Sequence, residues 1–153
     1  MLDMEQAVLS FQRHVGAPTP TWPRLAEGEA AMIAAQGREL RAASAAFKNL
    51  FKQTRNNAFL RVEQMLEELG EVLEGISEND QAKTLDGLVD SAYVVIGTAT
   101  SFNLPFNAAF EEVHRSNMTK TSRAASHSGD KGKGSGFIPA DIAGILNKHH
   151  ASG

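Results

Sequence analysis

Residues 61–76 read RVEQMLEELGEVLEGI, and residues 85–102 read LDGLVDSAYVVIGTATSF. In both segments apolar side chains recur every three or four positions, without the alternation that is typical of a half-buried strand. Helical spacing continues over most of the remaining chain. The sequence therefore predicts an all-α protein in which antiparallel helices are joined by short turns.

Prolines, glycines and short polar stretches divide the chain into helices. Six are expected, at about residues 4–15, 25–52, 58–77, 83–101, 106–118 and 140–148. The four from 25 to 118 are expected to form the core of a bundle, flanked by short terminal helices. Residues 121–136, TSRAASHSGDKGKGSG, are poor in apolar side chains and predict a flexible loop rich in Gly, Ser and Lys.

Length and composition narrow the class of protein. A chain of 153 residues is long enough for one domain with its own core, expected to span residues 1–153. The net charge of −3 does not favour binding to a nucleic acid polymer or an anionic membrane. The absence of cysteine excludes disulfides and thiolate zinc sites. The start, MLDMEQAVLS, does not have the pattern of a signal peptide, so a soluble cytoplasmic protein is expected.

The two quoted segments concentrate acidic residues. Glu67, Glu68 and Glu71 form an E-E-x-x-E array, and Asp86 and Asp90 lie one turn apart in the second segment. That second segment is apolar on all sides, which predicts a buried helix in which an unpaired carboxylate is costly. Antiparallel packing of the two helices would let five carboxylates face one another and hold a hard cation, Mg²⁺ first and Mn²⁺ second.

Simpler interpretations exist for both acidic groups. The glutamates would form an ordinary solvated face if nothing packed beside them. Asp86 would also be stabilised by the positive end of its own helix, an explanation that fits the more deeply placed Asp90 less well.

Basic and amide side chains follow the acidic segments. Arg115, Asn117 and Lys120 end the next helix in VHRSNMTK, and Lys131 and Lys133 lie in the Gly-rich loop. Such groups can hold phosphates opposite a metal ion. The alternative is that the first group favours a helix C-terminus and that the loop lysines are simply solvated.

Other chemistries have less support. Glu111 to His114 provide one E-x-x-H, whereas di-iron bundles need two such motifs. Neither a phosphate-binding loop nor a Ser-His-Asp arrangement is indicated. Trp22, between prolines, is expected to anchor the connector before the long helix.

With these residues in view, the chain resembles the MazG-like all-α nucleoside triphosphate pyrophosphohydrolases. It is most similar to the phosphoribosyl-ATP-pyrophosphohydrolase-like branch, which is common in phages and bacteria. The segments that carry the resemblance are QMLEELGEVLEGI, LDGLVDSAYVVIGTA, FNAAFEEVHRSNMTK and FIPADIAGIL. The resemblance implies a MazG-like helical fold, a homodimer or homotetramer, and Mg²⁺-dependent cleavage of a nucleotide between its α and β phosphates.

The resemblance also implies roles for particular residues. Glu67, Glu68, Glu71 and Asp90 would be metal ligands, and Glu68 would orient or deprotonate the attacking water. Asn117 and Lys120 would contact the phosphates or the metal-bound water. Many relatives carry E-x-x-D in the second segment, whereas here Gly87 stands at the glutamate position. Asp86, one residue earlier, is expected to substitute for it.

These residues and the resemblance leave three functions open. The first is Mg²⁺-dependent hydrolysis of a nucleoside or deoxynucleoside triphosphate to the monophosphate and pyrophosphate, with a purine substrate, dGTP or GTP, as the expected one. The second is a non-catalytic helical module that binds a nucleotide or a partner. The third is hydrolysis of phosphoribosyl-ATP. If a phage encodes the chain, it would act in the host cytoplasm.

Overall fold

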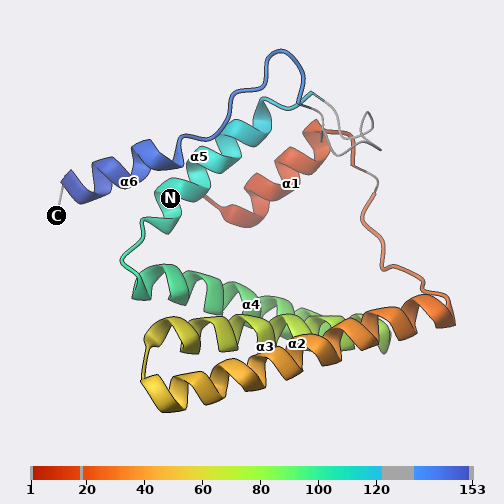
Figure 1. Ribbon diagram of the computed structural model, residues 1–153. Helices are drawn as coiled ribbons and strands as arrows, with labels where there is room; N and C mark the ends of the chain where they lie inside the picture. The colour runs from red at the N-terminus through yellow and green to blue at the C-terminus, as the bar shows by residue number, and fades with distance from the viewer. Residues whose placement is uncertain (1, 18, 122–132, 152–153) are drawn as a thin grey trace. The chain divides into compact units, whose positions relative to one another are not determined.

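The computed structural model describes residues 2–17, 19–121 and 133–151. These residues contain six helices and no strand (Figure 1), which confirms the all-α prediction. The helices are α1 (Met4–His14), α2 (Glu27–Thr54), α3 (Asn57–Ser77), α4 (Gln81–Ser101), α5 (Phe106–Met118) and α6 (Ile142–Ala151). Each lies within a few residues of its predicted position. Most of the loop predicted at 121–136 lies outside the described residues.

The helices group into two compact units. Unit 2 is Trp22–Phe102 and contains α2, α3 and α4, whereas unit 1 combines Met1–Thr21 with Asn103–Gly153 and contains α1, α5 and α6. The expected core of four helices therefore differs in one member, since α5 groups with α1 and α6. Short-range sequence periodicity predicts each helix but not which of two clusters it joins.

In unit 2, α3 lies between α2 and α4 and packs against both (Figure 1). Glycines bring α2 and α3 into close contact. A Cβ atom on Gly37 would lie 3.3 Å from the carbonyl oxygen of Gly70, and one on Gly70 would lie 3.0 Å from Cγ of Arg41. Larger side chains at this crossing would push the helices apart, because packed interiors have little spare volume.

Glycines also set the register between α3 and α4. A Cβ atom on Gly75 would lie 2.7 Å from the backbone nitrogen of Thr84, and one on Gly87 would lie 3.0 Å from Cγ2 of Val72. Residue 84 is therefore opposite residue 75, and residue 87 is opposite residue 72. The sum of the two numbers is constant, as it must be for antiparallel helices of equal rise.

Polar caps fix the turns that join these helices. The Asn56 side chain accepts a hydrogen bond from the amide of Ala58 at 2.9 Å, and Asp80 accepts one from the amide of Lys83 at 3.0 Å. Between α3 and α4, Asn79 is left-handed, with φ of 56°. Its side-chain oxygen accepts a hydrogen bond from Nε1 of Trp22 at 2.6 Å. This contact confirms that Trp22 anchors the connector before α2.

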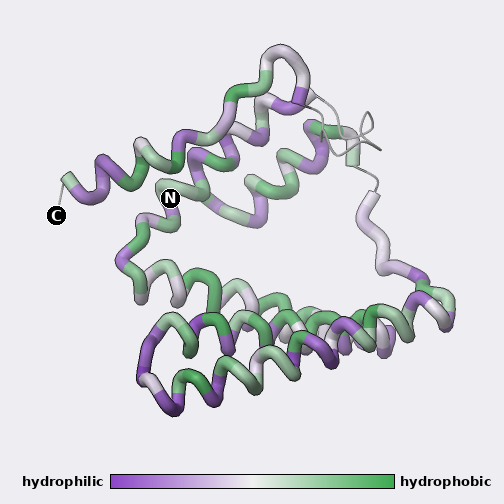
Figure 2. Tube along the Cα trace, viewed as in Figure 1, coloured by the Kyte–Doolittle hydropathy of each residue, from purple (hydrophilic) through white to green (hydrophobic). Residues whose placement is uncertain are grey.

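The prediction that α4 is a buried helix is wrong for the chain described. Its buried residues are Thr84, Gly87 and Ala99, and it packs on α3 through small side chains. Its larger apolar side chains remain exposed, up to 79% at Tyr93. Figure 2 shows the apolar residues that run along this helix. Periodicity reports how apolar a helix is, but not whether its own chain supplies the surface that covers it.

In unit 1, α1 packs against α5, and α5 against α6. The segment before α6 is tied to α5, since Oγ of Ser116 donates to the carbonyl of Ile138 at 2.8 Å. No helix in the described part of the chain is long and apolar enough to cross a bilayer.

Candidate active site

The packing of α3 against α4 brings the predicted acidic residues together. Because residue 87 is opposite 72, Asp90 is level with residue 69 and lies next to Glu68 along the helix pair. Asp86 precedes Asp90 by one turn on the same side of α4, and Glu67 and Glu71 flank Glu68 on α3. This register places the five carboxylates named from the sequence along one stretch of the α3–α4 pair, from the level of Glu67 to that of residue 73.

Electrostatics support this convergence. The pKa of Glu68 is raised, first because its half-buried carboxylate is partly desolvated. Repulsion from Glu71, Asp90, Glu67 and Asp86 raises it further. Toward the described residues, the side chains of Glu67, Glu68, Asp86 and Asp90 form no hydrogen bond or ion pair. Arg41 attracts Glu67 and Glu71, but no described side chain pairs with Glu68, Asp86 or Asp90, and a bound cation would relieve the repulsion among these three.

The five carboxylates are not arranged as a metal coordination shell in the structure. Within residues 2–17, 19–121 and 133–151, no three acidic or histidine side chains lie close enough to hold an ion in their present rotamers. Glu67, Glu68 and Glu71 are half-buried, and Asp86 and Asp90 are exposed, so the latter pair is free to rotate toward Glu68. Their role as ligands stays a prediction.

The structure explains the glycine in place of a glutamate at position 87. Gly87 is buried against α3, where a Cβ atom would lie 3.0 Å from Cγ2 and 3.1 Å from the amide nitrogen of Val72. A glutamate could not occupy this position without separating the helices. Asp86 precedes this position by one residue in α4, and its side chain is exposed. A carboxylate fits there without displacing α3.

An arginine that the sequence motifs do not include lies beside the acids. Nε and Nη2 of Arg41 bind the two carboxylate oxygens of Glu74 at 2.5 and 2.9 Å, and Nη2 lies 3.4 Å from Oε1 of Glu71. This bidentate ion pair, the Arg41 fork, lowers the pKa of Glu74 and raises that of Arg41. The sequence feature that points to Arg41 is a row of basic residues at helical spacing on α2, namely Arg38, Arg41, Lys48 and Lys52.

The predicted phosphate-binding residues all belong to unit 1, whereas the carboxylates belong to unit 2. Nζ of Lys120 donates to Oδ1 of Asn117 at 2.6 Å, so the structure brings these two together. Lys133 lies over the ring of Phe137, with Nζ 5.1 Å from its centroid. Lys131 lies outside the described residues.

Arg115 already has a structural partner. Its Nε and Nη2 bind the Glu112 carboxylate at 2.8 and 2.7 Å, and Nη2 also donates to the carbonyl of Pro139 at 3.1 Å. The Arg115 fork, followed by a hydrogen bond from the amide of Asp141, lowers the pKa of Glu112 to about 2. A phosphate contact by Arg115 would compete with this arrangement.

Comparison with known proteins identifies the family of the chain. Residues 41–117 match the family model of phosphoribosyl-ATP pyrophosphohydrolase, which is just over half of the chain. The chain belongs to this family, within the MazG-like all-α nucleoside triphosphate pyrophosphohydrolase superfamily. The comparisons with curated proteins and with solved structures found no match. The matched range includes all five acidic residues, Arg41 and Asn117, and the family's activity is that of a pyrophosphohydrolase acting on a nucleotide.

Proposed function

We propose that the protein hydrolyses a nucleoside or deoxynucleoside triphosphate between the α and β phosphates, giving the monophosphate and pyrophosphate. Family membership supports the class of reaction. The observation that carries the proposal is the environment of Glu68, a half-buried carboxylate with four more carboxylates close enough to raise its pKa. Such a cluster is unfavourable alone and suits a cationic cofactor.

We assign Mg²⁺, or Mn²⁺ in its place, to this cluster. The ligand set would be Glu67, Glu68, Glu71, Asp86 and Asp90, whose oxygens match the preference of hard divalent ions. When bound, the metal would make water a stronger nucleophile and would neutralise charge on the departing pyrophosphate.

The chain's own residues supply the remaining functions. Glu68 is assigned to orient the attacking water and to accept its proton as the water oxygen bonds to the α phosphorus. The bond from that phosphorus to the bridging oxygen breaks, and pyrophosphate leaves with the electron pair. Asn117 and Lys120, joined by their hydrogen bond, are proposed to contact the phosphates. Arg115, Lys131 and Lys133 are proposed as further phosphate contacts.

For the substrate we propose a purine nucleotide, dGTP or GTP. The second candidate is phosphoribosyl-ATP, favoured by the description of the matched family. Hydrolysis of phosphoribosyl-ATP much faster than of any common nucleotide would decide for it. A non-catalytic module would bind nucleotide without releasing pyrophosphate.

We also propose that the protein is a homodimer or homotetramer. On α4, Leu85, Leu88, Val89 and Ile96 are 42–63% exposed in the single chain. Burying apolar surface is favourable by about 25 cal/mol per Å², so a second copy that covers this side would be stabilised.

The experiment is pyrophosphate release from a panel of NTPs and dNTPs, with Mg²⁺ and with a chelator. Glu68→Gln and Asp90→Asn are expected to lower turnover by about 100-fold or more, because each removes a charged oxygen from the cluster. Glu78→Gln is the matched control, since Glu78 is an exposed α3-cap glutamate that pairs with Lys83. Unchanged turnover in both variants, or none in the native protein, would contradict the proposal.

A further inference from the structure

A small cavity adjoins the acidic cluster on its α2 side. It has a volume of about 110 Å³ and is lined by Arg41, Ser44, Ala45, Lys48 and Glu67. Glu67 is one of the proposed metal ligands, so the cavity and the carboxylate cluster share a wall. At roughly 30 Å³ per water molecule, the cavity holds the equivalent of about three or four waters, which suits phosphoryl groups rather than a nucleoside.

The lining adds two cationic side chains, Arg41 and Lys48, to the carboxylate of Glu67 that it shares with the cluster. Arg41 is held rigidly by its fork on Glu74, and its guanidinium lies 3.4 Å from Glu71. A fixed positive charge next to metal ligands opposes metal binding by Coulomb repulsion. The same charge favours a polyphosphate, which brings its negative charge to the site together with the metal. Arg41 already pairs with Glu74 and lies near Glu71, so it suits an anion in the cavity only together with the charge of Lys48.

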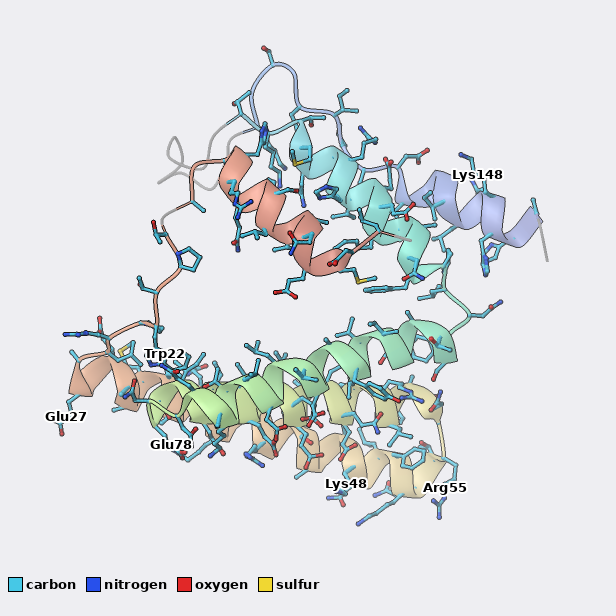
Figure 3. All side chains as sticks on the ribbon, turned by 180° about the vertical axis from the view of Figure 1, so that it is seen from behind. Trp22, Glu27, Lys48, Arg55, Glu78 and Lys148 are labelled. Atoms are coloured by element: carbon cyan, nitrogen blue, oxygen red, sulfur yellow. The ribbon has the colours of Figure 1, made fainter. Side chains whose placement is uncertain are left out.

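The ammonium group of Lys48 has hydrogen-bond donors available for such an anion. Its Nζ lies 3.6 Å from Oε1 of the buried Glu63, and its side chain is 56% exposed. An ammonium group has three donors, and this single long contact leaves others directed to solvent. Figure 3 labels Lys48 and shows its side chain extending from α2. Ser44 also lines the cavity, but its hydroxyl already donates to the carbonyl of Glu63 at 3.1 Å, so it offers no free donor.

We propose that Arg41 and Lys48 form an anion subsite that takes the pyrophosphoryl end of the substrate, the β and γ phosphates. This inference rests on the proposed function, because it assumes that the α phosphate lies at the carboxylates. The phosphate contacts expected from the sequence all lie in unit 1, and this subsite adds residues of unit 2 to them.

The competing explanation is that Lys48 serves only to neutralise Glu63. The test therefore removes that carboxylate first. Binding of inorganic pyrophosphate in Mg²⁺ is measured by calorimetry on the full chain for the native protein, Glu63→Gln, and Glu63→Gln combined with Lys48→Met. If Lys48 belongs to the subsite, Glu63→Gln binds pyrophosphate at least as tightly as the native protein. The double variant then binds it about tenfold or more weakly, the usual loss for a charge-assisted hydrogen bond.

Two more variants sharpen the result. Lys52→Met removes the next charge along the same row of α2 but not from the cavity wall, and is expected to leave binding unchanged. Arg41→Lys keeps the charge that pairs with Glu74 and loses the planar fork, so an intermediate loss is expected. The KM for the triphosphate should rise in the same order: unchanged in Lys52→Met, higher in Arg41→Lys, and highest in the double variant.

Three outcomes would overturn the subsite: no pyrophosphate binding by the native protein, equal binding by Glu63→Gln and the double variant, or an equal loss in Lys52→Met. The proposed function is judged separately, by pyrophosphate release from the native protein. Release without Lys48-dependent binding rejects the subsite alone. Lys48-dependent binding without release rejects the enzyme and keeps an anion site.

Discussion

The contact between Gly75 and Thr84 is expected to control both the stability of unit 2 and the geometry of the acidic cluster. In Gly75→Ala the new Cβ atom would lie 2.6 Å from Oγ1, 2.7 Å from the backbone nitrogen and 3.0 Å from Cα of Thr84. Rotating the Thr84 side chain relieves only the first contact. The other two involve backbone and Cα atoms, so α4 must move away from α3 by about 1 Å to restore ordinary contact.

The size of the effect follows from two opposing terms. Overpacking of this kind costs about 1–3 kcal/mol, and the backbone clash places Gly75→Ala toward the upper end. The higher helix propensity of alanine offsets about 1 kcal/mol. A net loss of about 1–2 kcal/mol in the free energy of unfolding is therefore expected. Because Asp86 and Asp90 move with α4, Mg²⁺ affinity should fall as well.

The assay is urea unfolding followed by circular dichroism, with and without Mg²⁺, together with calorimetric Mg²⁺ binding. The control is Gly28→Ala near the start of α2, where an added Cβ atom meets nothing within 4 Å and no stability should be lost. Unchanged or increased stability of Gly75→Ala, with full Mg²⁺ affinity, would refute the register on which the site depends.

Three further predictions concern other parts of the chain. Gly87→Glu restores the E-x-x-D pattern but drives a side chain into Val72, so unit 2 should be destabilised and pyrophosphate release reduced; a folded, more active variant would contradict this. Glu112 has a lowered pKa, so its stabilising contribution is present above its ordinary pKa of 4.5 and is lost as the pH falls through about 2. Glu112→Gln should therefore flatten the acid side of a plot of Tm against pH, and an equal slope in both proteins would contradict this. Val89→Glu places a charge on the exposed apolar side of α4 and should shift the protein to monomer in light scattering, whereas a native protein that is already monomeric would contradict the oligomer.

Much of the fold could be predicted because its determinants are local. Capping side chains such as Asn56 and Asp80, and the breaks around them, are visible in the sequence and set the helix ends. The burial of α4 could not be predicted, since it depends on which surface covers Leu88 and Val89. The grouping of α5 with α1 depends equally on contacts between distant segments.

The candidate site divides in the same way. The E-E-x-x-E array identifies Glu67, Glu68 and Glu71, and helical geometry alone places them side by side. Arg41 could not be assigned from the sequence, because its contact with Glu74 depends on the close approach of α2 and α3 at Gly37 and Gly70. The reason for Gly87 was likewise hidden until its packing against Val72 was known.

Whether the acidic cluster holds a metal can be decided by anomalous diffraction from crystals grown with Mn²⁺. We expect anomalous peaks bound by carboxylate oxygens of Glu68 and Asp90, with the neighbouring acids turned toward them. Mn²⁺ bound elsewhere, with Glu68 and Asp90 directed away from each other into solvent, would show that these carboxylates are not metal ligands.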